Sequence, residues 1–138
     1  MQNGNGHPAF ADDPQQQEYQ REAKRLYGNT DAWRQSQERT KHWTKADVER
    51  VKRDGQVFLQ ALAAGMDHAP GSAEAQGLMA QHRAGINTFY DCTDEIYAGL
   101  ADLYVNDARF AAYYDTARPG LAAWVREAML ISLGQHPA

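Results

Sequence analysis

Apolar side chains recur three and four residues apart along most of this chain, and that spacing is the strongest constraint on its fold. Such spacing places apolar side chains on one face of an α-helix. No segment alternates apolar and polar residues with period two, and no hairpin turn joins two apolar runs. The sequence therefore predicts an all-α protein. The longest stripe comprises Val48, Val51, Phe58, Leu59, Leu62 and Met66.

Capping residues divide the chain into about seven predicted helices. Asp13 and Pro14 begin a first helix that ends near Gly28, because Asp caps a helix start and Pro suits the first helical position. A second helix runs from about Thr30 to residue 41 or 42. A seventh begins at Pro119. The third to sixth helices are expected to follow the capping residues Thr44, Ser72, Thr93 and Asp107.

We expect aliphatic side chains to face the core in the later helices. Tyr97 and Tyr104 share a different face of the fifth helix, since they are seven residues apart. Gly55 interrupts the stripe of the third helix at a cost of about 1 kcal/mol relative to Ala, which indicates that another helix crosses closely there. The expected core faces are Leu78, His82, Ile86 and Phe89; Ile96, Leu100 and Leu103; and Leu121, Trp124, Val125, Ala128 and Ile131.

The N-terminal third differs in composition from the rest. Residues 2–45 contain no Val, Ile or Met and only one Leu. We expect residues 1–13 to be disordered, residues 14–43 to form two helices with little core of their own, and residues 44–135 to form the helical core. Two interpretations of residues 14–43 remain open. They are surface helices held permanently by a few aromatic contacts, or a lid that orders over a ligand.

Composition and charge exclude several classes of protein. The 138 residues fit one domain, and a net charge of -4 with scattered basic residues argues against a nucleic-acid binder that neutralises phosphates. No signal peptide or apolar run of about 20 residues is present, so we expect a cytoplasmic protein without membrane contact. A single cysteine, Cys92, excludes an internal disulfide and a Cys-based zinc site. The five histidines show no metal-ligand spacing, and neither metal nor cofactor is expected.

The sequence shows no catalytic motif, and an enzyme is not expected. Aromatic residues are concentrated between positions 89 and 124, which suits a pocket for a planar ligand. On an apolar helix face, His82 is either a satisfied core residue or a polar anchor within such a pocket. Amide groups at a helix start lower the pKa of the Cys92 thiol, whereas the neighbouring Asp91 and Asp94 raise it. We therefore do not expect an activated thiol.

Four segments together resemble one family, the TipAS-type antibiotic-recognition domain. They are "EYQREAKRLYGNTDAWRQSQERTKHWTKADVERV", "HRAGIN", "FYDCTDEIYAGLADLYVNDARFAAYYD" and "PGLAAWVREAM", and the likeness extends over roughly residues 17–131. The resemblance implies a globin-like helical fold whose N-terminal helices close over bulky antibiotics such as thiopeptides. It also implies the effector-sensing half of a MerR-type activator. The DNA-binding helix-turn-helix and the dimerising coiled coil of the homodimer would then lie outside this chain.

The resemblance also suggests where a ligand binds and how. Some members of the family trap thiopeptides covalently through a cysteine. The likelier trapping position corresponds to Gly99 here, so binding is expected to be non-covalent, with Cys92 at the edge of the site. The alternative function is a standalone protein that sequesters the antibiotic. Besides Cys92, the predicted ligand-binding residues are Trp33, His82, Phe89, Tyr90, Tyr97 and Tyr104.

Overall fold

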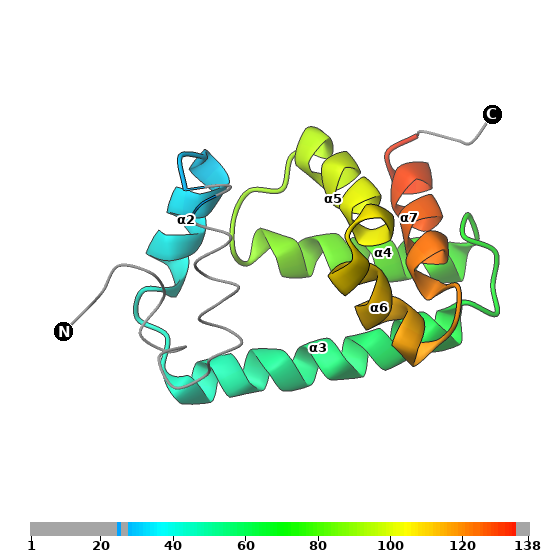
Figure 1. Cartoon of the computed structure of the whole chain (residues 1–138), viewed down its shortest axis with the longest axis horizontal. Helices are drawn as coiled ribbons and strands as arrows, with labels where there is room; N and C mark the ends of the chain where they lie inside the picture. Colours follow the sequence, from blue (N-terminus) through cyan, green and yellow to red (C-terminus); the bar gives the residue numbers. More distant parts are fainter. Residues whose placement is uncertain (1–24, 26–27, 135–138) are drawn as a thin grey trace. The chain divides into compact units, whose positions relative to one another are not determined.

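The computed structural model describes residue 25 and residues 28–134. This part of the chain contains helices only, which confirms the predicted all-α class (Figure 1). None of these helices is long and apolar enough to cross a membrane. The predicted segment 1–13 and, apart from Arg25, the predicted first helix lie outside the described residues. The helices are α2 (Asp31–Thr40), α3 (Lys45–Gly65), α4 (Ala73–Asn87), α5 (Asp94–Asn106), α6 (Ala108–Ala117) and α7 (Leu121–Ser132).

Most of these helices begin directly after the capping residues that the sequence predicts. At α3, Asp47 Oδ2 accepts a hydrogen bond from the Thr44 amide (2.9 Å) and Thr44 Oγ1 accepts one from the Asp47 amide (3.2 Å). This reciprocal capping box satisfies two amides that a helix start leaves without an intrahelical acceptor. The side chains of Thr30, Ser72, Thr93 and Asp107 accept from the amides of Trp33, Ala75, Ile96 and Arg109.

The start of α7 differs from the prediction. The helix begins at Leu121 rather than Pro119, and its N-cap residue Gly120 makes no side-chain hydrogen bond. Gly120 has φ of 87°, a left-handed conformation that glycine adopts without the steric cost of a side chain. The chain therefore turns at Pro119 and Gly120 before the helix begins.

Contacts divide the described chain into two compact units. The first comprises the residues up to Asp54 together with Ile86–Asp91, and the second comprises Gly55–Gly85 and the residues from Cys92 onward. Helices α3 and α4 contribute residues to both units.

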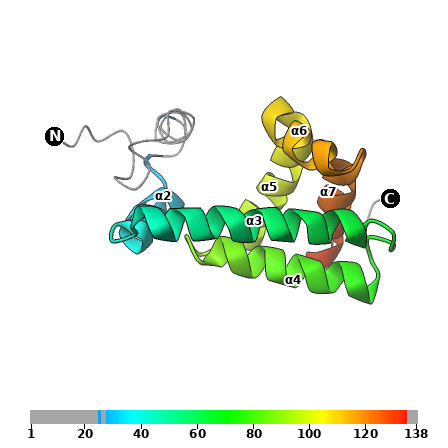
Figure 2. The ribbon, with the colours of Figure 1, turned by 90° about the horizontal axis from the view of Figure 1, so that it is seen from below.

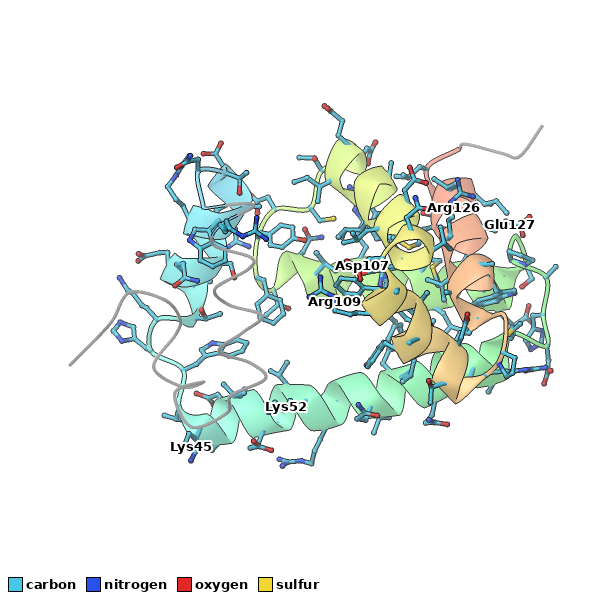
Figure 3. The ribbon with its side chains drawn as sticks, in the orientation of Figure 1. Lys45, Lys52, Asp107, Arg109, Arg126 and Glu127 are labelled. Carbon is cyan, nitrogen blue, oxygen red and sulfur yellow. The ribbon has the colours of Figure 1, made fainter. Side chains whose placement is uncertain are left out.

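In the second unit, α5, α6 and α7 pack against one another (Figure 1 and Figure 2). Arg126 of α7 (Figure 3) donates from Nε to the Asp102 carboxylate of α5 at 3.1 Å, which joins these helices at the surface. The predicted face of α7 is buried at Leu121, Trp124, Val125 and Ala128, and Ile131 is half-buried. The largest fully buried side chains of the described residues are Tyr97, Leu62, Met79, Leu121, Met129 and Val125.

The inward face of α5 is not the aliphatic one that the sequence predicts. Tyr97 and Ala101 are completely buried and Tyr104 is 7% exposed, whereas Ile96, Leu100 and Leu103 are only half-buried. A tyrosine ring buries more apolar area than an aliphatic side chain, and its hydroxyl can enter the core when it finds a partner. The expected aliphatic face was therefore wrong for α5.

The inward face of α4 also differs from the prediction. Ala75 and Met79 are its buried residues. The predicted face, by contrast, is half-buried at Leu78, His82 and Ile86 and, beyond the helix end, at Phe89. Small Ala75 lets the helix approach its neighbours closely, and flexible Met79 fills the space beside Tyr97.

In the first unit, Thr40 is the buried residue of α2, and polar side chains join this helix to the segment Ile86–Asp91. Arg39 donates to the Asn87 carbonyl (2.9 Å) and to the Asp91 carboxylate (2.7 Å). Gln35 accepts a hydrogen bond from the Asp91 amide at 2.7 Å. Exposed ion pairs such as these contribute at most about 1 kcal/mol each. Polar groups of the segment Ile86–Asp91 therefore help to hold α2.

The predicted close crossing at Gly55 is wrong, because a Cβ atom placed there would meet no atom within 4 Å. We therefore expect Gly55→Ala to raise the free energy of unfolding by up to about 1 kcal/mol. Gly120→Ala should instead lower it by about 1 kcal/mol, because alanine is strained at positive φ. Urea unfolding followed by circular dichroism measures both changes. A lower free energy of unfolding in Gly55→Ala would contradict this expectation, because it would show that another group occupies the space beside this glycine.

Candidate ligand-binding site

A continuous series of aromatic rings crosses the second unit from α3 to α6. We call it the aromatic ladder, and its members are Phe58, His82, Tyr104, Phe110, Tyr113 and Tyr114. Phe58 and His82 are stacked with ring centroids 6.2 Å apart and planes 16° apart. The edge of His82 meets Tyr104 at 5.9 Å. The ladder thus joins rings from α3, α4 and α5.

Helix α6 supplies the rest of the ladder. Tyr104 contacts Phe110 at 5.6 Å and Tyr114 at 5.0 Å, and Tyr113 meets Tyr114 edge-on at 5.2 Å. Residues three and four apart lie on one side of a helix, so Phe110, Tyr113 and Tyr114 share one side of α6. These tilted and edge-on pairs are the arrangements that aromatic rings prefer, and each stabilises the unit by about 1 kcal/mol beyond area burial.

Hydrogen bonds link the buried tyrosines through His82. Its Nδ1 lies 2.8 Å from the Tyr97 hydroxyl, and its Nε2 lies 3.4 Å from the Tyr104 hydroxyl. Tyr97 in turn donates to the Met79 carbonyl at 3.4 Å. Each neutral imidazole and each hydroxyl has one proton to donate.

One arrangement of protons satisfies every member of this chain. Tyr104 donates to His82 Nε2, and His82 Nδ1–H donates to Tyr97, whose hydroxyl donates to the Met79 carbonyl. We assign this arrangement on the pattern of partners, which fixes the Nδ1–H tautomer of neutral His82. Both nitrogen atoms of the imidazole are then occupied.

Burial keeps this network uncharged near neutral pH. Desolvation lowers the pKa of His82 to about 4 and raises the pKa of Tyr104 to about 12. Burial also raises the pKa of Tyr97 and of Tyr114. Because none of these groups ionises readily, the ladder offers ring faces rather than an acid, a base or a nucleophile.

Cys92 lies at the entrance to α5, where Arg83 fixes the backbone. The thiol is 6% exposed, and burial raises its pKa, while the Arg83 guanidinium opposes that rise. Burial, rather than the acidic neighbours considered from sequence, is thus the main cause. Arg83 Nε donates to the Cys92 carbonyl (3.2 Å), Nη2 contacts the Asp94 carboxylate (2.9 Å), and the guanidinium carbon lies 5.0 Å from the centroid of the Tyr97 ring.

An apolar strip runs along α5 next to the tyrosine face. Its residues, Ile96, Gly99, Leu100 and Leu103, are half-buried or exposed. A Cβ atom at Gly99 would meet nothing within 4 Å. Position 99 therefore accepts a side chain without displacing a neighbour.

The structure brings together some of the predicted site residues. His82, Tyr97 and Tyr104 are in direct contact, and Cys92 belongs to the same unit. The other three belong to the first unit, where Trp33 and Tyr90 are half-buried and Phe89 contacts Trp43 with ring centroids 5.4 Å apart. Among the described residues, no three His, Cys, Asp or Glu side chains form a group that could hold a metal ion.

Sequence reasoning missed several residues of this arrangement. The concentration of aromatic residues between positions 89 and 124 indicated Phe110, Tyr113 and Tyr114, although these three were not among the predicted ligand-binding residues. Phe58 belonged to an ordinary helical stripe. Spacing along the helix does not distinguish Arg83, because its partners Cys92 and Asp94 lie beyond the end of α4.

An aromatic ladder, an apolar strip and a ladder without ionised groups are the features that line sites of small-molecule-binding domains. Comparison with known families agrees: the pattern of the TipAS antibiotic-recognition domain matches residues 19–132. The chain belongs to this family.

Curated relatives of the chain are transcription activators. The HTH-type transcriptional activator TipA of Streptomyces coelicolor, and likewise that of Streptomyces lividans, is 40% identical over 128 residues. That match covers 90% of this chain and 49% of the relative. The HTH-type transcriptional activator mta of Bacillus subtilis is 34% identical over 117 residues, which cover 84% of this chain and 45% of mta. The chain thus spans about half the length of the curated relatives it matches.

A solved structure with the same fold contains a bound antibiotic. It is TipAS from Streptomyces lividans in complex with nosiheptide, from a study of a thiopeptide multidrug resistance system. The TM-score is 0.76 at 37% identity, over 94% of this chain and 92% of the other. The globin-like helical class expected from the resemblance agrees with this match.

The lowered pKa of His82 makes the stability of the domain depend on pH. The unfolded chain binds a proton near pH 6.5, whereas the folded chain does so only near pH 4. Stability should therefore fall as the pH drops from about 6.5 to 4, by up to about 1.4 kcal/mol per pH unit. Urea unfolding at pH 7, 6 and 5 measures this slope.

His82→Gln removes the titrating group and should flatten the slope. Because the same carboxylates titrate in the wild type and in His82→Gln, their contribution cancels in the comparison. Equal slopes in the wild type and His82→Gln would contradict the assigned neutral histidine.

Proposed function

We propose that this chain is the drug-sensing domain of a MerR-type transcription activator and binds bulky antibiotics such as thiopeptides. The match along 94% of the chain to TipAS bound to nosiheptide carries this proposal. The activators TipA and mta, which are about twice as long, support the transcriptional role. DNA would be contacted by a helix-turn-helix segment of a homodimeric full-length protein and not by this domain.

The ligand is bound non-covalently in this proposal, against the aromatic ladder and the apolar strip of α5. Tyr97 and Tyr104 hold the imidazole of His82 in place through hydrogen bonds. His82 then presents the face of its ring to the ligand. Cys92 does not react, because its thiol is buried and its pKa is raised. No catalytic step is proposed, since the ladder holds no group that is ionised near neutral pH.

The signal is a population shift in α2, the described part of the predicted lid. This helix buries only Thr40 and is held on Ile86–Asp91 by polar contacts from Arg39 and Gln35. Segments with little buried surface open at low free-energy cost. A ligand that favours the ordered α2 would shift this equilibrium by its differential affinity, and the ordering would be passed to the DNA-binding half.

Nosiheptide is therefore expected to bind the domain and to slow amide exchange in α2 by at least about tenfold. Tryptophan fluorescence gives the affinity, and hydrogen–deuterium exchange with mass spectrometry gives the protection. Amides of the α7 core, buried at Val125 and Ala128, serve as the internal control and should change little. Equal exchange of α2 with and without saturating nosiheptide would rule out the lid.

Incubation with a dehydroalanine-bearing thiopeptide should give no adduct with the wild-type protein. Gly99→Cys should gain one, because an exposed thiol on the apolar strip can add to the dehydroalanine: sulfur bonds to the methylene carbon and a proton goes to the α-carbon. Intact mass then increases by the mass of the antibiotic. Gly77→Cys, at an exposed and equally open glycine of α4, is the matched control. An adduct on Cys92 would contradict non-covalent binding.

A further inference from the structure

We infer that Arg83 and Asp91 are positioning residues that couple the docking of α2 to the placement of the Tyr97 ring. This inference rests on the proposed function, and it identifies the route by which the docking of α2 affects the residues around His82. The contacts that carry it run from α2 to Asp91, from Cys92 to Arg83, and from Arg83 to Tyr97.

Helix α2 holds Asp91 at both its main chain and its side chain. Gln35 Oε1 accepts a hydrogen bond from the Asp91 amide at 2.7 Å, and Arg39 Nη2 donates to the Asp91 carboxylate, also at 2.7 Å. Gln35 and Arg39 are four residues apart and therefore lie on one face of the helix. Because these contacts restrain the backbone of Asp91 as well as its side chain, the docking of α2 fixes the conformation of this residue.

Arg83 holds the next residue along the chain. Its Nε donates to the Cys92 carbonyl at 3.2 Å, its Nη2 donates to the same oxygen, and Nη2 lies 2.9 Å from the Asp94 carboxylate. Asp91 belongs to the first unit and Cys92 to the second, so the peptide bond between them joins the units covalently. Because peptide groups are planar, few dihedral angles separate the Asp91 amide from the Cys92 carbonyl. A change at Asp91 therefore moves an acceptor of Arg83.

Tyr97 receives this change through Arg83. The guanidinium carbon lies 5.0 Å from the centroid of the Tyr97 ring, and a planar guanidinium shifts as a whole when one of its acceptors moves. Tyr97 is completely buried, and its hydroxyl lies 2.8 Å from His82 Nδ1. In a close-packed interior, a displaced ring displaces its neighbours. The hydrogen bond to His82 thus depends on a carbonyl that α2 helps to place.

Two other ion pairs provide matched controls. Arg34 pairs with Asp31, three residues away within α2, and is the control for Arg39. Arg126 pairs with Asp102 and joins α7 to α5 (Figure 3), and is the control for Arg83. Removing either control contact takes a guanidinium from the same helix or the same unit but leaves Asp91 and Arg83 in place.

The first experiment follows hydrogen–deuterium exchange of the α2 amides, in the free protein and with saturating nosiheptide. Arg83→Lys keeps the charge but loses the planar pair of donors, and it should speed this exchange by about threefold or more. Arg126→Lys should leave the exchange unchanged. Since Arg39→Gln already cuts the link, adding Arg83→Lys to it should have no further effect on α2. Exchange of the α7 amides around Val125 corrects for any change in global stability.

The second experiment runs in the opposite direction, because coupling between two sites is reciprocal. Arg39→Gln should shift the ring resonances of Tyr97 and the imidazole ¹⁵N resonances of His82, whereas Arg34→Gln should leave both unchanged. If Arg39 only held α2, its loss would not move resonances in the second unit. Arg39 is exposed, so this variant keeps the test decisive even if Arg83→Lys unfolds the protein.

Three results would overturn the inference. The first is exchange of α2 that is the same in Arg83→Lys as in Arg126→Lys, and the second is an additive effect in the double variant. The third is unprotected α2 amides in the wild type both with and without nosiheptide, because Asp91 would then hold no docked helix.

The coupling and the proposed function fail in different ways. If nosiheptide binds the wild type but Arg83→Lys and Arg39→Gln behave like their controls, the coupling is wrong and the drug-sensing function stands. If nosiheptide does not bind, but each variant still affects the other unit of the free protein, the coupling stands and the proposed antibiotic is wrong.

Discussion

The burial of tyrosine hydroxyls is the constraint on which the second unit depends. Tyr97, Tyr104 and Tyr114 lie in its core, and a buried hydroxyl without a partner costs about 1–3 kcal/mol. His82 resolves this because a neutral imidazole both donates and accepts, so it joins Tyr104 to Tyr97, and the Met79 carbonyl ends the chain. Hydrogen bonds as well as apolar packing therefore set the positions of the buried rings. The exposed rings that pack on them rest on a fixed support.

The sequence predicted the helical class and nearly all helix starts, because both follow from local chemistry. The capping hydrogen bonds at Thr44, Ser72 and Thr93 depend on residues three positions away. The inward face of α5 could not be predicted in the same way. Hydrophobicity ranks Ile and Leu above Tyr, but the burial of Tyr97 depends on His82, which lies on another helix. The first predicted helix falls on residues that are not described.

The candidate site was predicted as a set of residue types rather than as an arrangement. His82, Tyr97 and Tyr104 were selected, and they are in contact. Trp33, Phe89 and Tyr90 belong to the other unit, and their part in binding stays a prediction. Phe58 could not be found, because its stacking on His82 joins two helices whose relative rotation only tertiary packing determines. Sequence spacing gives the face of one helix, not its pairing with the next.

The contacts that hold α2 have a consequence for the order in which the chain assembles. Arg39 and Asp91 are 52 residues apart, and Gln35 and Asp91 are 56 apart. During synthesis at about 5–20 residues per second, α2 leaves the ribosome several seconds before the segment to which it binds. A short helix with little buried surface is marginal on its own. Docking of α2 therefore waits until the segment that carries Asp91 has been synthesised.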